Sequence, residues 1–184
     1  MPQPFKTDIE AIRQRARQHM EQGAVTAAYK ADRVQVIKVL NEVLATEIVC
    51  YLRYKNHYFM ASGINSEPIA EEFLQHATEE QGHADMVARR IVQLGGMPNM
   101  NPEGLQTRSH AQYAEGQTLE QMIREDLVAE RIAIETYAEI VRWLGDDDPT
   151  TRRMIEEILT VEEEHADDLA NMLTRLPDRS RSPT

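Results

Sequence analysis

Apolar residues recur at intervals of three and four along four long stretches of the chain, a pattern typical of amphipathic helices. Glycine or proline follows each stretch and would terminate a helix there. Asp32, Thr118 and Asp148 precede three of the stretches and are suited to cap a helix N-terminus. We therefore predict long helices over residues 32–61, 66–94, 118–145 and 148–176.

The connections between these helices predict how they pack. The first and last connections are short, so each joins an antiparallel helical hairpin. The middle connection, of about two dozen residues, is long enough to cross a whole bundle. A shorter helix is predicted over Thr7–Gln22, in an N-terminal arm of residues 1–31, and the tail 177–184 is expected to be disordered. The prediction is an all-α fold: an antiparallel four-helix bundle over 32–176 with a long crossover and an extra N-terminal helix.

Composition and charge exclude some classes of protein for this chain. No stretch approaches the roughly eighteen consecutive apolar residues of a membrane span, and the N-terminus has no apolar signal segment. We therefore expect no membrane partner. A single cysteine excludes an intramolecular disulfide, so we expect a cytoplasmic protein. The net charge of -11 makes a DNA partner unlikely and suits the attraction of cations.

Each of the four apolar stripes is interrupted by one glutamate: Glu47, Glu80, Glu130 and Glu162. A buried carboxylate without a partner is strongly penalised, and no lysine or arginine lies on these stripes near the glutamates. His83 and His165 do lie on these stripes. Each follows a glutamate by three residues, in the only two Glu-x-x-His sequences of the chain. Residues three apart share a helix face, so each pair can serve one metal site.

The spacing of these residues repeats along the chain. Glu47 and Glu80 are 33 positions apart, and Glu130 and Glu162 are 32 apart, so a lone Glu followed by Glu-x-x-His occurs twice. A single Glu-x-x-His is usually part of a solvated face, but two in phase with two lone glutamates favour a buried site. Two divalent ions would balance four carboxylates, and oxygen and imidazole ligands suit iron or manganese.

The segments that carry these residues resemble those of bacterioferritins, a ferritin-like di-iron family. The similar segments are LNEVLATEIVCYLRY, EEQGHADMVARRIVQLGGMPN, DLVAERIAIETYAEIV and ILTVEEEHADDLANML. The resemblance covers roughly residues 34–176 and is specific, because six ligand-type positions agree together.

The resemblance implies a role for each residue and two iron ions per subunit. Glu47 with His83 would hold one iron, Glu130 with His165 the other, and Glu80 and Glu162 would bridge them. Tyr54 falls where the family has a tyrosine near the iron. It fits an electron donor and, equally, a core tyrosine whose hydroxyl bonds a ligand carboxylate.

The activity implied is that of a ferroxidase, which oxidises Fe(II) with O2 or H2O2. The Fe(III) product would be stored as mineral inside a homo-oligomeric cage.

Two departures from the family bear on this expectation. Gln81 stands where the family's haem-binding methionine would be, and methionines such as Met60 and Met86 are usually packing residues, which argues against haem. A short fifth helix after residue 176 is not predicted, which favours a shell of twelve subunits over twenty-four.

Two alternatives remain at this stage. One is another di-iron or manganese enzyme: a rubrerythrin-like peroxidase, a substrate oxidase or a manganese catalase. Rubrerythrins usually carry Cys-x-x-Cys pairs, whereas this chain has only Cys50, which we interpret as a small core residue. The other is a DNA-protecting miniferritin, which the acidic charge disfavours.

His76, four residues before Glu80, fits either an inward-facing residue near the site or a surface histidine.

Overall fold

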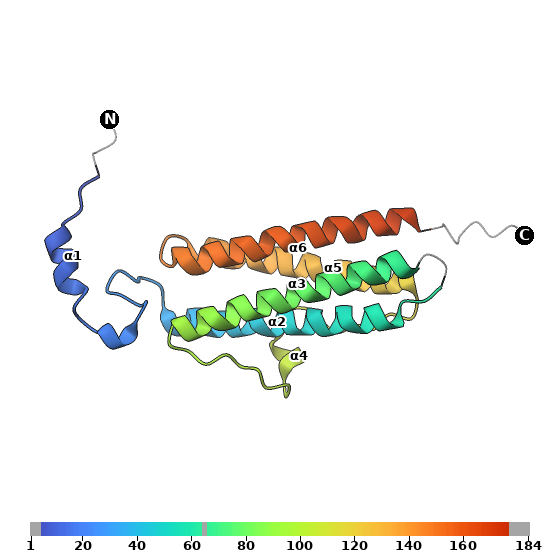
Figure 1. Ribbon diagram of the computed structural model, residues 1–184, viewed down its shortest axis with the longest axis horizontal. Helices are drawn as coiled ribbons and strands as arrows, with labels where there is room; N and C mark the ends of the chain where they lie inside the picture. The colour runs from blue at the N-terminus through green and yellow to red at the C-terminus, as the bar shows by residue number, and fades with distance from the viewer. Residues whose placement is uncertain (1–4, 64–65, 177–184) are drawn as a thin grey trace, which may run out of the picture.

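The computed structural model describes residues 5–63 and 66–176, and that part of the chain contains helices and no strand (Figure 1). The elements in order are α1 (Ile9–Arg15), the 3-10 turn η1 (Met20–Gln22), α2 (Arg33–Met60), α3 (Ser66–Gln93), α4 (Leu105–Arg108), α5 (Leu119–Leu144) and α6 (Pro149–Arg175). The all-α prediction is confirmed, and the four long helices match their predicted bounds to within one residue at each end.

Local capping explains why the long helices begin where they do. The Asp32 carboxylate accepts hydrogen bonds from the first backbone N–H groups of α2. The Thr118 hydroxyl accepts from the N–H of Gln121, and Asp148 caps α6 by accepting from the N–H of Thr151. Each cap satisfies backbone donors that have no partner within the helix.

The four long helices form one antiparallel bundle (Figure 1). α2 packs along α3, and α5 packs along α6, so each short connection closes a hairpin. The crossover of residues 94–118 runs back along the outside of the bundle, so that α2 meets α5 and α3 meets α6. None of the helices in the described residues is long and apolar enough to cross a membrane.

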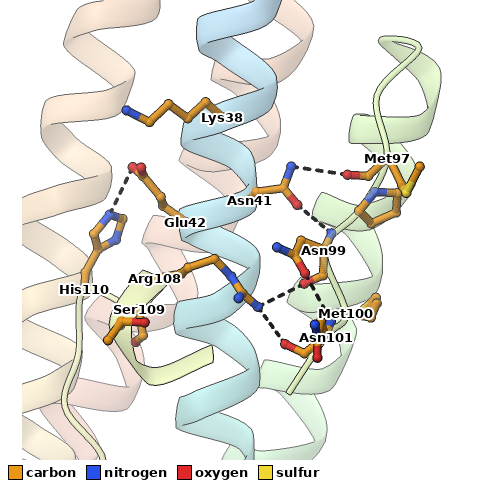
Figure 2. A pocket seen from close by; sticks show the side chains of 12 residues that line it. Lys38, Asn41, Glu42, Met97, Asn99, Met100, Asn101, Arg108, Ser109 and His110 are labelled. Atoms are coloured by element: carbon orange, nitrogen blue, oxygen red, sulfur yellow. Dashed lines mark hydrogen bonds and ion pairs between the residues drawn. The ribbon is translucent and has the colours of Figure 1, made fainter. Parts of the chain in front are cut away.

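The crossover is held against α2 by side-chain contacts. The Asn41 side-chain oxygen accepts a 2.6 Å hydrogen bond from the backbone N–H of Asn99. Within the crossover, Arg108, at the end of the one-turn helix α4, donates to the backbone carbonyl of Asn101 at 2.8 Å. An open groove of about 1020 Å³ remains between the crossover and α2 (Figure 2), and it lies away from the glutamates of the bundle interior.

The N-terminal segment differs from its prediction. A helix is present, but α1 ends at Arg15, its cap is Asp8 rather than Thr7, and a left-handed His19 separates it from η1. No residue of α1 is buried. A helix this short gains little without an apolar face to pack, so local propensity alone did not extend it. The predicted disordered tail, 177–184, lies outside the described residues.

Candidate metal centre

Six buried polar side chains occupy a layer between two apolar clusters of the bundle core. On α3, Ala77 of one cluster and Ala84 of the other bracket Glu80 and His83. The exposed fraction is 6% for His83 and at most 2% for the other five, Glu47, Glu80, Glu130, Glu162 and His165. The predicted ligand residues therefore lie in the core, and all four long helices contribute to them.

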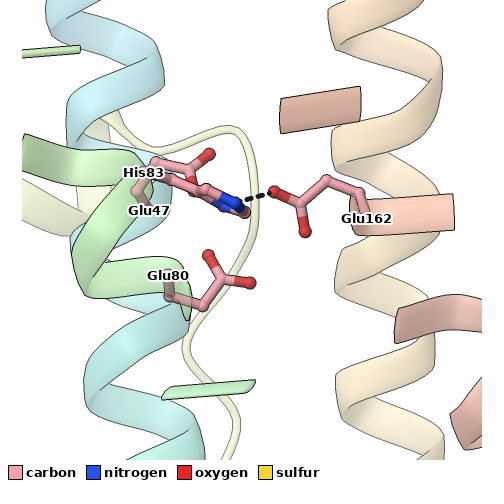
Figure 3. A group of neighbouring side chains, drawn as sticks. All are labelled: Glu47, Glu80, His83 and Glu162. Carbon is pink, nitrogen blue, oxygen red and sulfur yellow. Dashed lines mark hydrogen bonds and ion pairs between the residues drawn. The ribbon is translucent and has the colours of Figure 1, made fainter. Parts of the chain in front are cut away.

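The ligand atoms of these residues form two overlapping groups. Within each group, one oxygen or nitrogen atom per residue lies within 4.8 Å of all the others. The first group is Glu47, Glu80, His83 and Glu162, and the second is Glu80, Glu130, Glu162 and His165. In Figure 3, Glu162 reaches from α6 toward the side chains of the α2–α3 hairpin. Glu80 and Glu162 belong to both groups, so one carboxylate from each hairpin is common to the two groups.

Several of these buried atoms have no hydrogen-bond partner. They are Oε1 of Glu80, Oε2 of Glu130, both carboxylate oxygens of Glu162 and Nδ1 of His165. The two Glu162 oxygens lie 3.1 Å from Nδ1 of His83 and 3.3 Å from Nδ1 of His165, ion-pair contacts that lack the geometry of a hydrogen bond. An orphaned buried polar atom costs free energy, so such a concentration needs a compensating ligand. Carboxylate oxygens and imidazole nitrogens that converge on one space suit iron or manganese, and this donor set fits such ions.

Burial and crowding perturb the acid–base behaviour of the cluster. Burial first, and then the nearby carboxylates, raise the pKa of Glu80 and Glu130 well above the usual value for glutamate. Burial alone would lower the pKa of His83, but its contacts with Glu162 and Glu47 raise it to about 10. The metal-free cluster therefore retains protons, which bound cations would replace.

Two tyrosines bond the outer glutamates of the cluster. Tyr54 on α2 donates a hydrogen bond to Glu130, and Tyr137 on α5 donates one to Glu47. Sequence reasoning placed Tyr54 near the site but assigned Tyr137 no role. The signal was available, because each tyrosine follows the glutamate of its own helix by seven residues.

A further carboxylate that sequence reasoning missed orients a histidine of the cluster. Glu79 on α3 lies 2.7 Å from Nε2 of His165. The other ring nitrogen, Nδ1, faces the glutamates, 3.3 Å from Glu162 and 3.6 Å from Glu80. A carboxylate on the outer nitrogen fixes the tautomer and leaves the inner nitrogen free to bind a metal.

Buried charges next to the cluster were also missed. Arg53 on α2 is 1% exposed and pairs with Asp126 on α5 at 2.8 Å, and the other Asp126 oxygen lies 2.7 Å from Nδ1 of His57. Because Asp126 pairs with Arg53, this cation compensates the four glutamates only in part, through its attraction to Glu130. Arg53 and His57 also contact the backbone carbonyls of Gln112 and Ala114, which fixes the end of the crossover beside the site.

The remaining residues discussed from the sequence have clear positions. Cys50 is buried in the core, as interpreted, and Gln81 is exposed on α3. Met60 is 59% exposed at the end of α2, and Met86 is partly buried against the core. His76 is 1% exposed, which decides between its two readings: it faces inward, with Nδ1 3.3 Å from the Tyr54 hydroxyl.

Comparison with known proteins places this arrangement among the ferritins. Residues 37–178 match the ferritin-like domain. A bacterioferritin from Brucella melitensis is 31% identical over 145 residues, which cover 77% of this chain and 84% of that protein. A DNA protection during starvation protein from Pyrococcus furiosus is 30% identical over 149 residues, covering 78% of this chain and 79% of that protein.

Solved structures agree with the sequence comparison. The bacterioferritin-related protein from Bacteroides fragilis, a dodecameric thioferritin, superposes with a TM-score of 0.76 and 31% identity. The match covers 79% of this chain and 88% of that one. The residues that match the ferritin-like domain, 37–178, span the six residues of the buried cluster.

Proposed function

This chain belongs to the family of ferritin-like domain proteins, and on that premise we propose that it is a ferroxidase that stores the iron it oxidises. Fe(II) would bind as substrate at the buried glutamate–histidine cluster. One observation carries the proposal: two overlapping groups of four ligand residues occur within a single chain and share Glu80 and Glu162.

The overlap of the two groups supports a proposed role for each residue. Glu47 and His83 belong only to the first group and would bind one iron, while Glu130 and His165 would bind the other. The shared carboxylates of Glu80 and Glu162 would bridge the two ions. Four carboxylates and two divalent cations leave the layer close to neutral, which suits its burial between apolar clusters.

The proposed reaction takes one electron from each of two Fe(II) ions. With dioxygen, two Fe(II), one O2 and two protons give two Fe(III) and one H2O2. With hydrogen peroxide, two Fe(II), one H2O2 and two protons give two Fe(III) and two H2O. The protein holds both substrate ions beside one oxidant molecule, and the bridging carboxylates can change their coordination as the charge on iron rises. Glu79 and the two tyrosines keep the ligands oriented during turnover.

Storage needs an enclosed space that one bundle does not supply, so we propose that the chain assembles into a closed homo-oligomeric cage. The similarity to the dodecameric protein of Bacteroides fragilis supports twelve subunits. Closed shells use the same contacts on every subunit. The chain's net charge of -11 would make such a shell strongly attractive to Fe(II).

A DNA-protecting role is the second candidate, because one relative is a DNA protection during starvation protein. The acidic charge of this chain opposes sequence-independent binding to the phosphate backbone. We therefore expect the assembled protein not to retard plasmid DNA in a gel at low salt. Retardation that salt reverses would instead support the DNA-protecting role.

Anaerobic Fe(II) titration followed by exposure to oxidant tests the ferroxidase proposal. The cluster should take up two Fe(II) per chain and oxidise both rapidly. Glu162→Gln should abolish the rapid phase, because an amide cannot bridge two cations as a carboxylate does. Glu163→Gln, an exposed neighbour that loses the same charge, is the matched control and should oxidise iron normally. Equal rates in the two variants would contradict the assignment.

A further inference from the structure

We propose that Glu72, His76 and Asp168, from α3 and α6, form a third, separate site for a divalent transition-metal cation. One atom from each residue lies within 4.8 Å of the other two. Glu72 and His76 are one turn apart on α3, and Asp168 is on α6. None of the three residues belongs to either group of the buried cluster.

The orientation of His76 carries the inference. Its side chain is 1% exposed, yet its Nε2 atom has no hydrogen-bond partner. Nε2 lies 3.5 Å from a carboxylate oxygen of Glu72, without forming a hydrogen bond to it. Leaving a buried ring nitrogen unsatisfied is costly, so the position needs a ligand that the described residues do not provide.

The hydrogen-bond network fixes which ring nitrogen carries the proton. The single hydroxyl hydrogen of Tyr54 is donated to Glu130, so the Tyr54 oxygen can only accept from His76. Nδ1 of His76 lies 3.3 Å from that oxygen and is therefore the protonated nitrogen. Nε2 is left with a lone pair near the two carboxylates, and a cation can satisfy three acceptors that lie within 4.8 Å of one another.

The residue types narrow the class of cation. One imidazole nitrogen and two carboxylates are ligands for Fe(II), Mn(II), Co(II) or Zn(II), whereas Ca²⁺ and Mg²⁺ prefer oxygen alone. Three protein ligands leave coordination positions open to water. Such a site binds and releases its ion more readily than a closed one.

This third site is open to solvent and adjoins the buried cluster. Asp168 is exposed and the Glu72 side chain is 30% exposed, whereas Glu80 and Glu162 are each 1% exposed. The His76 ring stacks on His165 with ring centroids 3.9 Å apart and an angle of 22° between the planes. An ion at Glu72, His76 and Asp168 would thus occupy the solvent side of the His165 position. The natural ion would be Fe(II) that moves on to the buried cluster, and this part of the inference rests on the proposed function. The existence of the third site does not depend on the proposed function.

Counting bound Co(II) tests the third site without any redox step. The assembled, metal-free protein is dialysed to saturation against Co(II), and bound metal per chain is measured by elemental analysis. We expect three ions in the wild type, and two in Asp168→Asn and in Glu72→Gln. Asp167→Asn, an exposed neighbour with the same loss of charge, is the matched control and should keep three.

The location of the lost ion separates this proposal from the proposed function. Anomalous scattering from Co(II)-soaked crystals should show a peak beside His76 Nε2 that disappears only in the Asp168→Asn and Glu72→Gln variants. Two ions in the wild type, both at the buried cluster, would overturn the third site and leave the ferroxidase proposal intact. A single ion, lost in Asp168→Asn, would support the third site and overturn the two-metal cluster. Three ions retained in Asp168→Asn would also overturn the third site.

Discussion

Tyr137 on α5 donates a hydrogen bond to Glu47 on α2, and this contact joins the two hairpins at the level of the buried cluster. The reverse contact is also present, since Tyr54 on α2 donates to Glu130 on α5. The two glutamates that belong to only one ligand group are thus each held by a tyrosine from the facing helix. The arrangement fixes both carboxylates before any cation binds, which reduces the ordering that binding requires.

Removing one of these hydroxyls should weaken metal binding at one position only. In Tyr137→Phe, the carboxylate of Glu47 loses its donor, and affinity for the ion at Glu47 and His83 should fall by about 10- to 100-fold. Tyr54→Phe should affect the Glu130 position instead. Zn(II) calorimetry in the Asp168→Asn background, which removes a ligand of the proposed third site, resolves the two binding events of the buried cluster. Tyr113→Phe, a tyrosine of the crossover, is the control. Equal weakening of both positions by Tyr137→Phe would contradict the pairing.

Loss of a bridging carboxylate should be more damaging than loss of a terminal one. We expect Glu80→Ala and Glu162→Ala each to abolish rapid Fe(II) oxidation, while Glu47→Ala retains a slow phase. Helix content should survive in all three, because an unpaired buried carboxylate destabilises the metal-free protein and its removal is tolerated. Stopped-flow absorbance and circular dichroism measure the two properties. A faster rate in Glu80→Ala than in Glu47→Ala would show that Glu80 is not a bridge.

The metal-free protein should lose stability as the pH rises. The pKa of His83 is raised from 6.5 to about 10, so its stabilising contribution is complete below pH 6.5 and is lost as the pH approaches 10. The raised pKa values of Glu80 and Glu130 act in the same direction. The melting temperature measured in EDTA should therefore fall across this window, and His83→Gln should flatten the slope. A melting temperature that rises with pH would contradict the assignment of protons in the cluster.

The purified protein should lack the strong Soret absorption of bound haem. Gln81 offers an amide, which is a poor axial ligand compared with the sulfur of methionine. Spectra recorded before and after haem addition provide the measurement, and Gln81→Met tests whether the missing ligand is the cause. A stoichiometric Soret band in the wild type, lost in Met60→Leu or Met86→Leu, would contradict this expectation and identify the ligand.

The assembled particle should be a closed cage of twelve chains. Native mass spectrometry measures the number directly, on protein prepared with and without iron. The dodecameric state of the similar Bacteroides fragilis protein motivates the number. A particle of twenty-four chains would contradict the proposed number of subunits but not the cage. A stable dimer without a larger species would contradict the proposal that the protein stores iron.

The sequence determined the helices and the six candidate ligands. Their detection required only local geometry, because residues three or four apart share a helix face and a glutamate on an apolar stripe must enter the core. Caps at Asp32, Thr118 and Asp148 fixed the helix bounds in the same local way. The N-terminal helix is present, but it is shorter than the predicted span of residues 7–22, because none of its residues is buried to stabilise a longer helix.

Tertiary structure alone decided which side chains meet across helices. Asp126 lies 73 positions from Arg53 and 69 from His57, so no local spacing relates them. Glu72 and Asp168 are likewise brought together only by the packing of α3 on α6. The rotation of each helix about its axis sets these contacts, and that rotation results from packing the whole core rather than from the sequence of any one helix. Periodicity thus determined which face of a helix is buried, and the assembled bundle determined which partner each buried polar atom finds or lacks.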